Sequence, residues 1–267
     1  DEYLRSGGLG RYLDVNGEKP YNAIEMDEKL SLAMKGEHFN GIATRDYRVL
    51  HHTSKDPYFK KVLNHYNDTH LSEHNLGYLY QTMIEAKSSA NYIYENTKIQ
   101  TSQEAYPQTI FAKQLKNAAQ FINSGLETKV FYTSLTGFDT HANQSSKQKH
   151  LLAQYANSVA AFVKDLKRNN TFEDTLVLTF SEFGRRVKQN AANGTDHGAA
   201  NNVFIIGKNL KKAGFYNTLA SLTDLDSNGD LKYEIDFRSV YATILSKWMN
   251  VSPDGIIKSK PKTLNFI

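Results

Sequence analysis

The strongest constraint on the fold is an alternation of apolar runs with one amphipathic helix. Residues 129–135, 175–180 and 202–206 are rich in β-branched and aromatic side chains, which is typical of buried strands. Between the first two runs, residues 146–168 carry apolar side chains at helical spacing, with lysine and glutamine on the opposite face. This order predicts βα units, and therefore an α/β fold whose three strands are adjacent in a mainly parallel sheet.

Two further helices frame these strands. Residues 108–124 carry an apolar face at helical spacing, and Gly125 follows as a helix stop. Asp236 is placed to cap a last helix over residues 237–249.

The upstream part of the chain is polar and rich in asparagine, histidine and tyrosine. We expect residues 1–105 to form mostly helical or irregular cover, with helices near 56–66 and 72–100. Residues 106–267 then hold the core βα units, and the whole chain, 1–267, is interpreted as a single α/β domain.

Composition excludes several classes of function. The chain has no cysteine, so disulfides, thiolate metal sites and a cysteine nucleophile are excluded. The net charge of +4 is mild and the lysines and arginines are scattered, which argues against nucleic-acid binding. No apolar run approaches the roughly 20 residues that span a bilayer.

Metal-ligand side chains gather where a parallel sheet would bind a ligand, beyond the carboxyl ends of the strands. That rule selects the loops 136–144, 181–198 and 207–217. The first two contain carboxylates and imidazoles, the donors that suit Zn²⁺, Mn²⁺, Mg²⁺ or Ca²⁺. The candidate ligands are Asp139, His141, Glu182, Asp196 and His197.

Each of these residues also has a structural interpretation. An isolated Asp-x-His pair is more often a cap or a hydrogen-bonded pair than a metal site, and Asp139 can close an Asx-turn. Spacing alone therefore leaves the metal site and the turn about equally open. Arg185 and Arg186 also have two interpretations: they form a solvated loop end, or they contact an anion beside a metal site.

Two other patterns are weaker. Residues 224–235 open like an EF-hand loop, but Ile235 stands where a bidentate glutamate is required, so a turn at Asn228 and Gly229 is favoured. Five other histidines have no accompanying acidic motif and are interpreted as surface residues. They are His51, His52, His65, His70 and His74.

Five segments, in order along nearly the whole chain, resemble the signatures of the bacterial family called domain of unknown function 1501. Residues 137–144, GFDTHANQ, resemble its Gly-Trp-Asp-Thr-His-x-x-Gln signature, with Phe138 in place of tryptophan. The other matching segments are GLGRYL at 8–13, TFSEFGR at 179–185, GTDHG at 194–198 and DFRSVY at 236–241.

The resemblance implies a relationship to alkaline phosphatases, sulfatases and cofactor-independent phosphoglycerate mutases. It implies a doubly wound sheet with helices on both faces, a divalent metal cofactor, and often export to the periplasm or secretion. Arg185 becomes a candidate contact for an anionic substrate. The metal ligands carried over are Asp139, His141, Glu182, Asp196 and His197.

Members of this family normally have a long portion before the Gly-Leu-Gly-Arg segment, with the first strand, an early metal-binding aspartate and the nucleophile region. We therefore expect this chain to be a C-terminal portion with an incomplete sheet, and its nucleophile to lie upstream. The hydroxyls of Thr136, Thr140, Ser181 and Thr195 are interpreted as structural.

The favoured function is a metal-dependent hydrolase of small phosphate or sulfate esters. The alternative is a non-catalytic exported binding or scaffold protein that keeps the fold. A third hypothesis, a carbohydrate-active surface protein, depends only on the many tyrosines and asparagines.

Overall fold

A computed structural model describes residues 5–65, 75–97 and 102–267 of the chain. The chain divides into two compact units, residues 1–134 and 135–267. Both contain helices and short strands, so the α/β class is confirmed.

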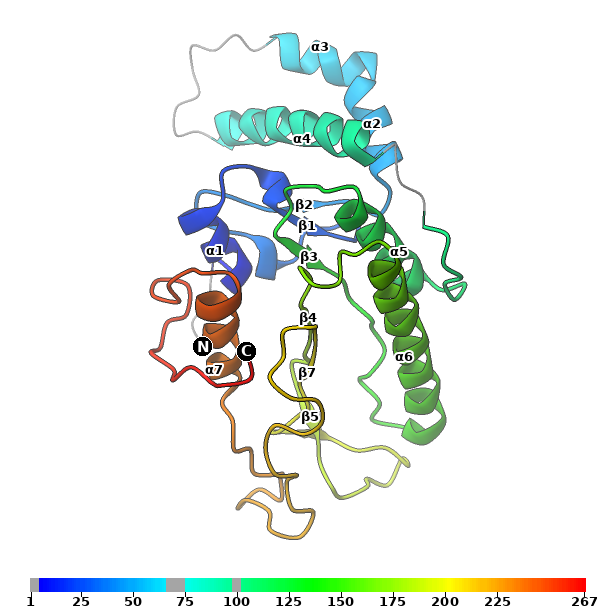
Figure 1. Ribbon diagram of the computed structural model, residues 1–267, viewed down its shortest axis with the longest axis vertical. Helices are drawn as coiled ribbons and strands as arrows, with labels where there is room; N and C mark the ends of the chain where they lie inside the picture. Colours follow the sequence, from blue (N-terminus) through cyan, green and yellow to red (C-terminus); the bar gives the residue numbers. More distant parts are fainter. Residues whose placement is uncertain (1–4, 66–74, 98–101) are drawn as a thin grey trace. The chain divides into compact units, whose positions relative to one another are not determined.

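The first unit contains a small parallel sheet with the strand order β2-β1-β3 (Figure 1). Its strands are β2 (Ile42–Ala43), β1 (Ala23–Glu25) and β3 (Val130–Tyr132). In the central strand Ile24 pairs with Ile42 on one side and with Phe131 on the other. Ile24 is fully buried, as expected for a parallel sheet that is covered on both faces.

Helices account for most of the remaining first unit. They are α1 (Gly8–Asn16), α2 (Tyr47–Lys55), α3 (Pro57–His65), α4 (Asn75–Thr97) and α5 (Ile110–Asn123), with 3-10 turns η1 (Pro20–Asn22) and η2 (Leu32–Met34). In α5, the Thr109 hydroxyl accepts the Ala112 N–H and caps the start of the helix. The helix ends before Gly125, whose φ of +73° is left-handed, so the predicted helix stop is confirmed.

The Gly-rich start of α1 is explained by close backbone packing. A Cβ on Gly7 would lie 2.1 Å from the Leu32 carbonyl oxygen, and one on Gly10 would lie 1.9 Å from that of Lys35. The Gly7 N–H donates to the Lys35 carbonyl at 2.8 Å. Glycine is therefore required where this helix lies directly on the main chain of η2 and its following turn.

Asp14, also in α1, binds the backbone of residues 37–39, which follow η2 and the turn at Lys35. Its carboxylate accepts the backbone N–H groups of Glu37, His38 and Phe39 at 2.8, 2.8 and 2.7 Å. Partial desolvation raises the pKa of Asp14, but these three donors and the charge of His38 outweigh it, so the pKa is lowered.

The second unit contains two short antiparallel pairs and one long helix. Strands β4 (Val177–Thr179) and β7 (Phe204–Ile206) form one pair, and β5 (Gly184–Arg185) and β6 (His197–Gly198) form the other. Helix α6 (Gln144–Arg168) lies before them in the chain, and α7 (Phe237–Thr243) continues into the π-helix η3 (Ile244–Trp248).

Most of the predicted apolar stripe of α6 lies on the face that the helix buries, although Leu152 of that stripe is exposed. Val159, Phe162 and Leu166 are all less than 7 % exposed, and Tyr155 shares a hydrogen bond of 2.8 Å with Thr179 of β4. In α7, the Asp236 carboxylate accepts the Arg238 N–H, so the predicted cap is confirmed.

The prediction that strands near 129–135, 175–180 and 202–206 are neighbours in one parallel sheet is wrong. β3 pairs with β1, whereas β4 and β7 pair with each other and are antiparallel. Residues 1–105 were expected to be helical or irregular cover, yet they contribute the other two strands of the sheet that contains β3. Strands of two or three residues, such as Ala23–Glu25, are too short to show a periodic pattern.

The segment that resembles an EF-hand forms a turn, as predicted. Leu225 and Leu231 pair across it in an antiparallel bridge, and Gly229 has a φ of +79°. The Asp226 carboxylate accepts the Asn228 and Asp230 N–H groups at 2.9 and 2.8 Å, which is the mechanism of an Asx-turn.

The histidines of the first unit include one with a clear structural contact. His51 stacks on Tyr94 with ring centroids 3.7 Å apart and planes 1° from parallel. His70, His74 and the side chain of His65 lie outside the described residues. No helix in the described ranges is both long and apolar enough to cross a membrane.

We expect Gly10→Ala to lower the free energy of unfolding by about 1–3 kcal/mol, because its methyl group collides with the Lys35 carbonyl. Gly8→Ala is the matched control: its Cβ would meet only the end of the Arg11 side chain, at 4.0 Å. Urea unfolding should show Gly8→Ala unchanged or up to about 1 kcal/mol more stable. Equal effects of the two substitutions would contradict the packing explanation.

We expect Asp14→Ala to cost about 1 kcal/mol at neutral pH, because three N–H groups lose a partly buried acceptor. The folded-state pKa of Asp14 is lowered, so its contribution is present above the unfolded pKa of about 3.9 and disappears as the pH falls through the folded value. Unfolding curves of wild type and Asp14→Ala should therefore converge below about pH 4. A difference that stays constant down to pH 2 would exclude the ionised carboxylate as its source.

Candidate metal site

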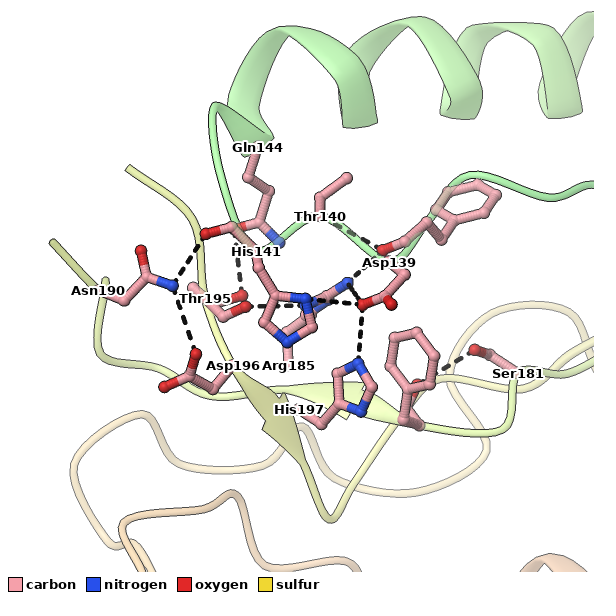
Figure 2. A network of polar contacts seen from close by, with 12 residues as sticks. Asp139, Thr140, His141, Gln144, Ser181, Arg185, Asn190, Thr195, Asp196 and His197 are labelled. Atoms are coloured by element: carbon pink, nitrogen blue, oxygen red, sulfur yellow. Dashed lines mark hydrogen bonds and ion pairs between the residues drawn. The ribbon is translucent and has the colours of Figure 1, made fainter. Parts of the chain in front are cut away.

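The site lies in the second unit, between the loop that precedes α6 and the β5–β6 hairpin. In that hairpin Arg185 pairs directly with His197. Residues directly opposite in an antiparallel pair project from the same face of the sheet. The hairpin therefore presents Arg185 and His197 side by side toward Asp139 (Figure 2).

The two loops make direct backbone contact. The Asn143 and Gln144 N–H groups donate to the carbonyls of Ala192 and Asn193, both at 3.0 Å. A Cβ on Gly194 would lie 2.3 Å from the carbonyl carbon and oxygen of His141. Only glycine permits this approach, which explains its place at the start of the Gly-Thr-Asp-His-Gly segment.

Asn190 ties the same loops together through its side chain. Its amide oxygen accepts the Ala192 and Gly194 N–H groups at 3.0 Å each. Its amide nitrogen donates to the His141 carbonyl at 2.9 Å and to the Asp196 carboxylate at 3.3 Å. The turn of residues 190–194 is thereby fixed against the backbone of His141.

Arg185 connects three segments of the site. Its guanidinium donates to the Thr195 carbonyl at 2.8 Å and to the Phe138 carbonyl, and it lies 3.4 Å from Asp139 Oδ1. The group also lies over the Phe183 ring, 4.9 Å from the centroid. Only 15 % of the side chain is exposed, so most of its N–H donors face other groups of the protein and not solvent.

The candidate ligands that converge are Asp139, His141 and His197. Asp139 Oδ1 lies 2.9 Å from His141 Nδ1 and 2.8 Å from His197 Nε2 (Figure 2). One ligand atom from each residue lies within 4.8 Å of the other two. All three side chains are about half exposed, at 60 %, 50 % and 46 %, so the cluster opens to solvent.

The electrostatics of the cluster keep Asp139 ionised. The hydrogen bond from His197 lowers the pKa of Asp139, and the charges of His141, His197 and Arg185 lower it further, against the effect of desolvation. An ionised carboxylate only accepts hydrogen bonds. In the hydrogen bond between His197 and Asp139, His197 Nε2 is therefore the donor.

Aromatic stacking sets the orientation of His197. Its ring lies on Phe183 with centroids 3.8 Å apart and planes 8° from parallel. The His141 ring lies 4.9 Å from that of His197. Phe183 therefore supports both His197 and Arg185 from the middle of the Ser-Glu-Phe-Gly-Arg segment.

Two of the predicted ligands lie outside this cluster. Glu182 is exposed and is absent from the group of ligand atoms that gather around Asp139. Asp196 faces Asn190 instead. Neighbouring residues of an extended chain point to opposite sides, so Asp196 and His197 cannot both face Asp139 from this backbone.

The nearby hydroxyls have structural contacts. Thr140 is buried and donates to the Phe138 carbonyl at 3.3 Å, while Ser181 donates to the Phe183 carbonyl at 3.1 Å. The Thr195 hydroxyl donates to the side chain of Gln144 at 3.1 Å. Gln144 is the glutamine that ends the resembled Gly-Trp-Asp-Thr-His-x-x-Gln signature, whereas nothing in the sequence marked Asn190 as a residue of the site.

The family described as "Protein of unknown function (DUF1501)" matches residues 10–258, so the chain belongs to this family. The match includes both loops of the site. No curated protein and no solved structure matches the chain.

We expect Asn190→Ala to lower the free energy of unfolding by about 1–3 kcal/mol, because two N–H groups and the His141 carbonyl lose their partner. Hydrogen exchange of the amides in residues 139–144 and 190–196 should accelerate. Gln189→Ala is the control, since among the described residues the Gln189 side chain bonds only to Asn193, in its own turn. If Asn190→Ala leaves exchange in residues 139–144 unchanged, Asn190 does not join the loops.

Proposed function

We propose that this protein is a metal-dependent hydrolase of phosphate or sulfate esters, with Asp139, His141 and His197 as the metal ligands of its site. The observation that carries the proposal is the convergence of one carboxylate and two imidazoles from separate loops, with ligand atoms within 4.8 Å. The cluster faces solvent on one side, where a substrate has access.

The donor set fits a first-row divalent ion. Imidazole nitrogens suit Zn²⁺ and related metals, and sites built from two histidines and one carboxylate are common in hydrolases. Mg²⁺ and Ca²⁺ prefer oxygen ligands alone, so Zn²⁺ or Mn²⁺ is favoured over them. A divalent ion supplies Lewis acidity toward an ester oxygen.

The surrounding residues would hold the metal ligands in position. Arg185 and Asn190 fix the two loops that carry the ligands, and Phe183 orients His197. The Arg185 guanidinium lies 3.4 Å from Asp139 and adds positive charge beside the place where an anionic ester would bind. Its bonds to backbone carbonyls make positioning its first role and substrate contact a second.

The proposed relationship is to the alkaline phosphatase and sulfatase type, with a doubly wound sheet. Membership of the family and the parallel sheet β2-β1-β3 support it. We assign no nucleophile, because Thr140, Ser181 and Thr195 each donate to an oxygen of the protein.

A second candidate function is a non-catalytic binding or scaffold protein with one structural ion. Its support is that Asp139 and His141 belong to one loop and His197 to another, so that an ion bound to all three would cross-link the loops. Removal of metal would then lower stability without a loss of turnover.

We expect Asp139→Asn, His141→Ala and His197→Ala each to weaken Zn²⁺ binding by at least the 10- to 100-fold that changes around a metal site typically cost. Isothermal titration calorimetry of the wild type and variants measures this. His150→Ala is the control, because His150 is an exposed histidine of α6 outside the cluster. Unchanged affinity in the three variants would reject the site.

The same variants test catalysis. Hydrolysis of 4-nitrophenyl phosphate and 4-nitrophenyl sulfate by the Zn²⁺- or Mn²⁺-loaded protein should fall with metal affinity and remain unaffected in His150→Ala. Tight metal binding with a large gain in unfolding temperature and no turnover of either ester would favour the structural ion instead.

A further inference from the structure

A cleft of about 370 Å³, lined mostly by polar and charged residues, lies in the second unit and shares three residues with the metal-site network. These are Gln144, Arg185 and Thr195. The volume falls within the range of roughly 300–1,000 Å³ that small-molecule sites occupy. The remaining lining residues are Gln148, Arg186, Ala200, Asn201, Asn202, Ala220 and Leu231.

The charged side chains of the cleft are already paired. Arg185 donates to two backbone carbonyls and lies beside Asp139. Arg186 Nε lies 3.2 Å from the nearly buried carboxylate of Asp230. Neither arginine presents an uncompensated charge, so the cleft is poorly suited to a second anionic group.

The polar groups that remain are amides. Gln144 and Gln148 lie four residues apart on α6 and therefore on one face of the helix. Within the described part of the chain, the side-chain amides of Gln148 and Asn202 have no hydrogen-bond partner, whereas that of Asn201 donates to the Phe183 carbonyl. Each free amide offers both donors and an acceptor.

Amides that can donate and accept match hydroxyl groups, which do the same. The apolar side chains of Ala200, Ala220 and Leu231 add surface for C–H groups. We propose that this cleft binds the neutral, hydroxyl-rich part of the ester, a sugar ring whose phosphate or sulfate group reaches the cluster of Asp139, His141 and His197. The inference rests on the proposed function and names its substrate class as sugar esters.

Binding of glucose 6-phosphate and glucose 6-sulfate to the whole chain tests the inference, with 4-nitrophenyl phosphate and sulfate as esters without a sugar. Saturation-transfer NMR, with and without Zn²⁺, reports binding whether or not turnover occurs. We expect Gln148→Leu and Asn202→Leu each to weaken sugar-ester binding about 3- to 10-fold, as the loss of one hydrogen bond does. Binding of the aryl esters should be unchanged.

Gln154→Leu, a glutamine of α6 outside the cleft, is the control and should bind all four esters as the wild type does. The inference is overturned if the wild type fails to bind either sugar ester, or if the two cleft variants weaken sugar and aryl esters equally. Cleft-dependent binding of sugar esters without Zn²⁺ affinity or hydrolysis would overturn the proposed function and leave the cleft as a sugar-ester site.

Discussion

The candidate site depends on direct contact between two backbones, that of Gly194 and that of His141. At 2.3 Å from a hypothetical Cβ, the His141 carbonyl leaves no room for any side chain at residue 194. This contact brings the loop of Asp139 to the hairpin of His197, and the hydrogen bonds of Asn190 and Arg185 then fix the two loops in place. Each bond is modest by itself, so the geometry follows from their number and from the close approach.

The sequence predicted the elements of the fold better than their pairing. The long periodic helices α5 and α6, the Asp236 cap and the Gly125 stop were foreseen because each has a local physical signature. The sheet β2-β1-β3 was missed because its outer partner Ile42–Ala43 and its centre Ala23–Glu25 lack such a signature. The antiparallel pairing of β4 and β7 could not be predicted either, because an apolar run in the sequence is compatible with a parallel or an antiparallel neighbour.

The same distinction applies to the site. Asp139, His141 and His197 were found from residue type and from the family resemblance, and they meet at one carboxylate oxygen. Glu182 and Asp196 have the same chemistry but different directions, and direction depends on the alternation of side chains along an extended chain. The role of Asn190 could not be predicted from the sequence, because it depends on which backbone groups lie near its side chain in the folded loops.

The position of Asp139 Oδ1 beside two imidazoles affects any uptake of an ion at the proposed site. While the carboxylate is ionised, His197 Nε2 carries the proton of their hydrogen bond. An ion that bound through the same nitrogen would need its lone pair, so the proton would first have to move to the opposite ring nitrogen or to solvent. The carboxylate would therefore compete with such an ion for His197 Nε2.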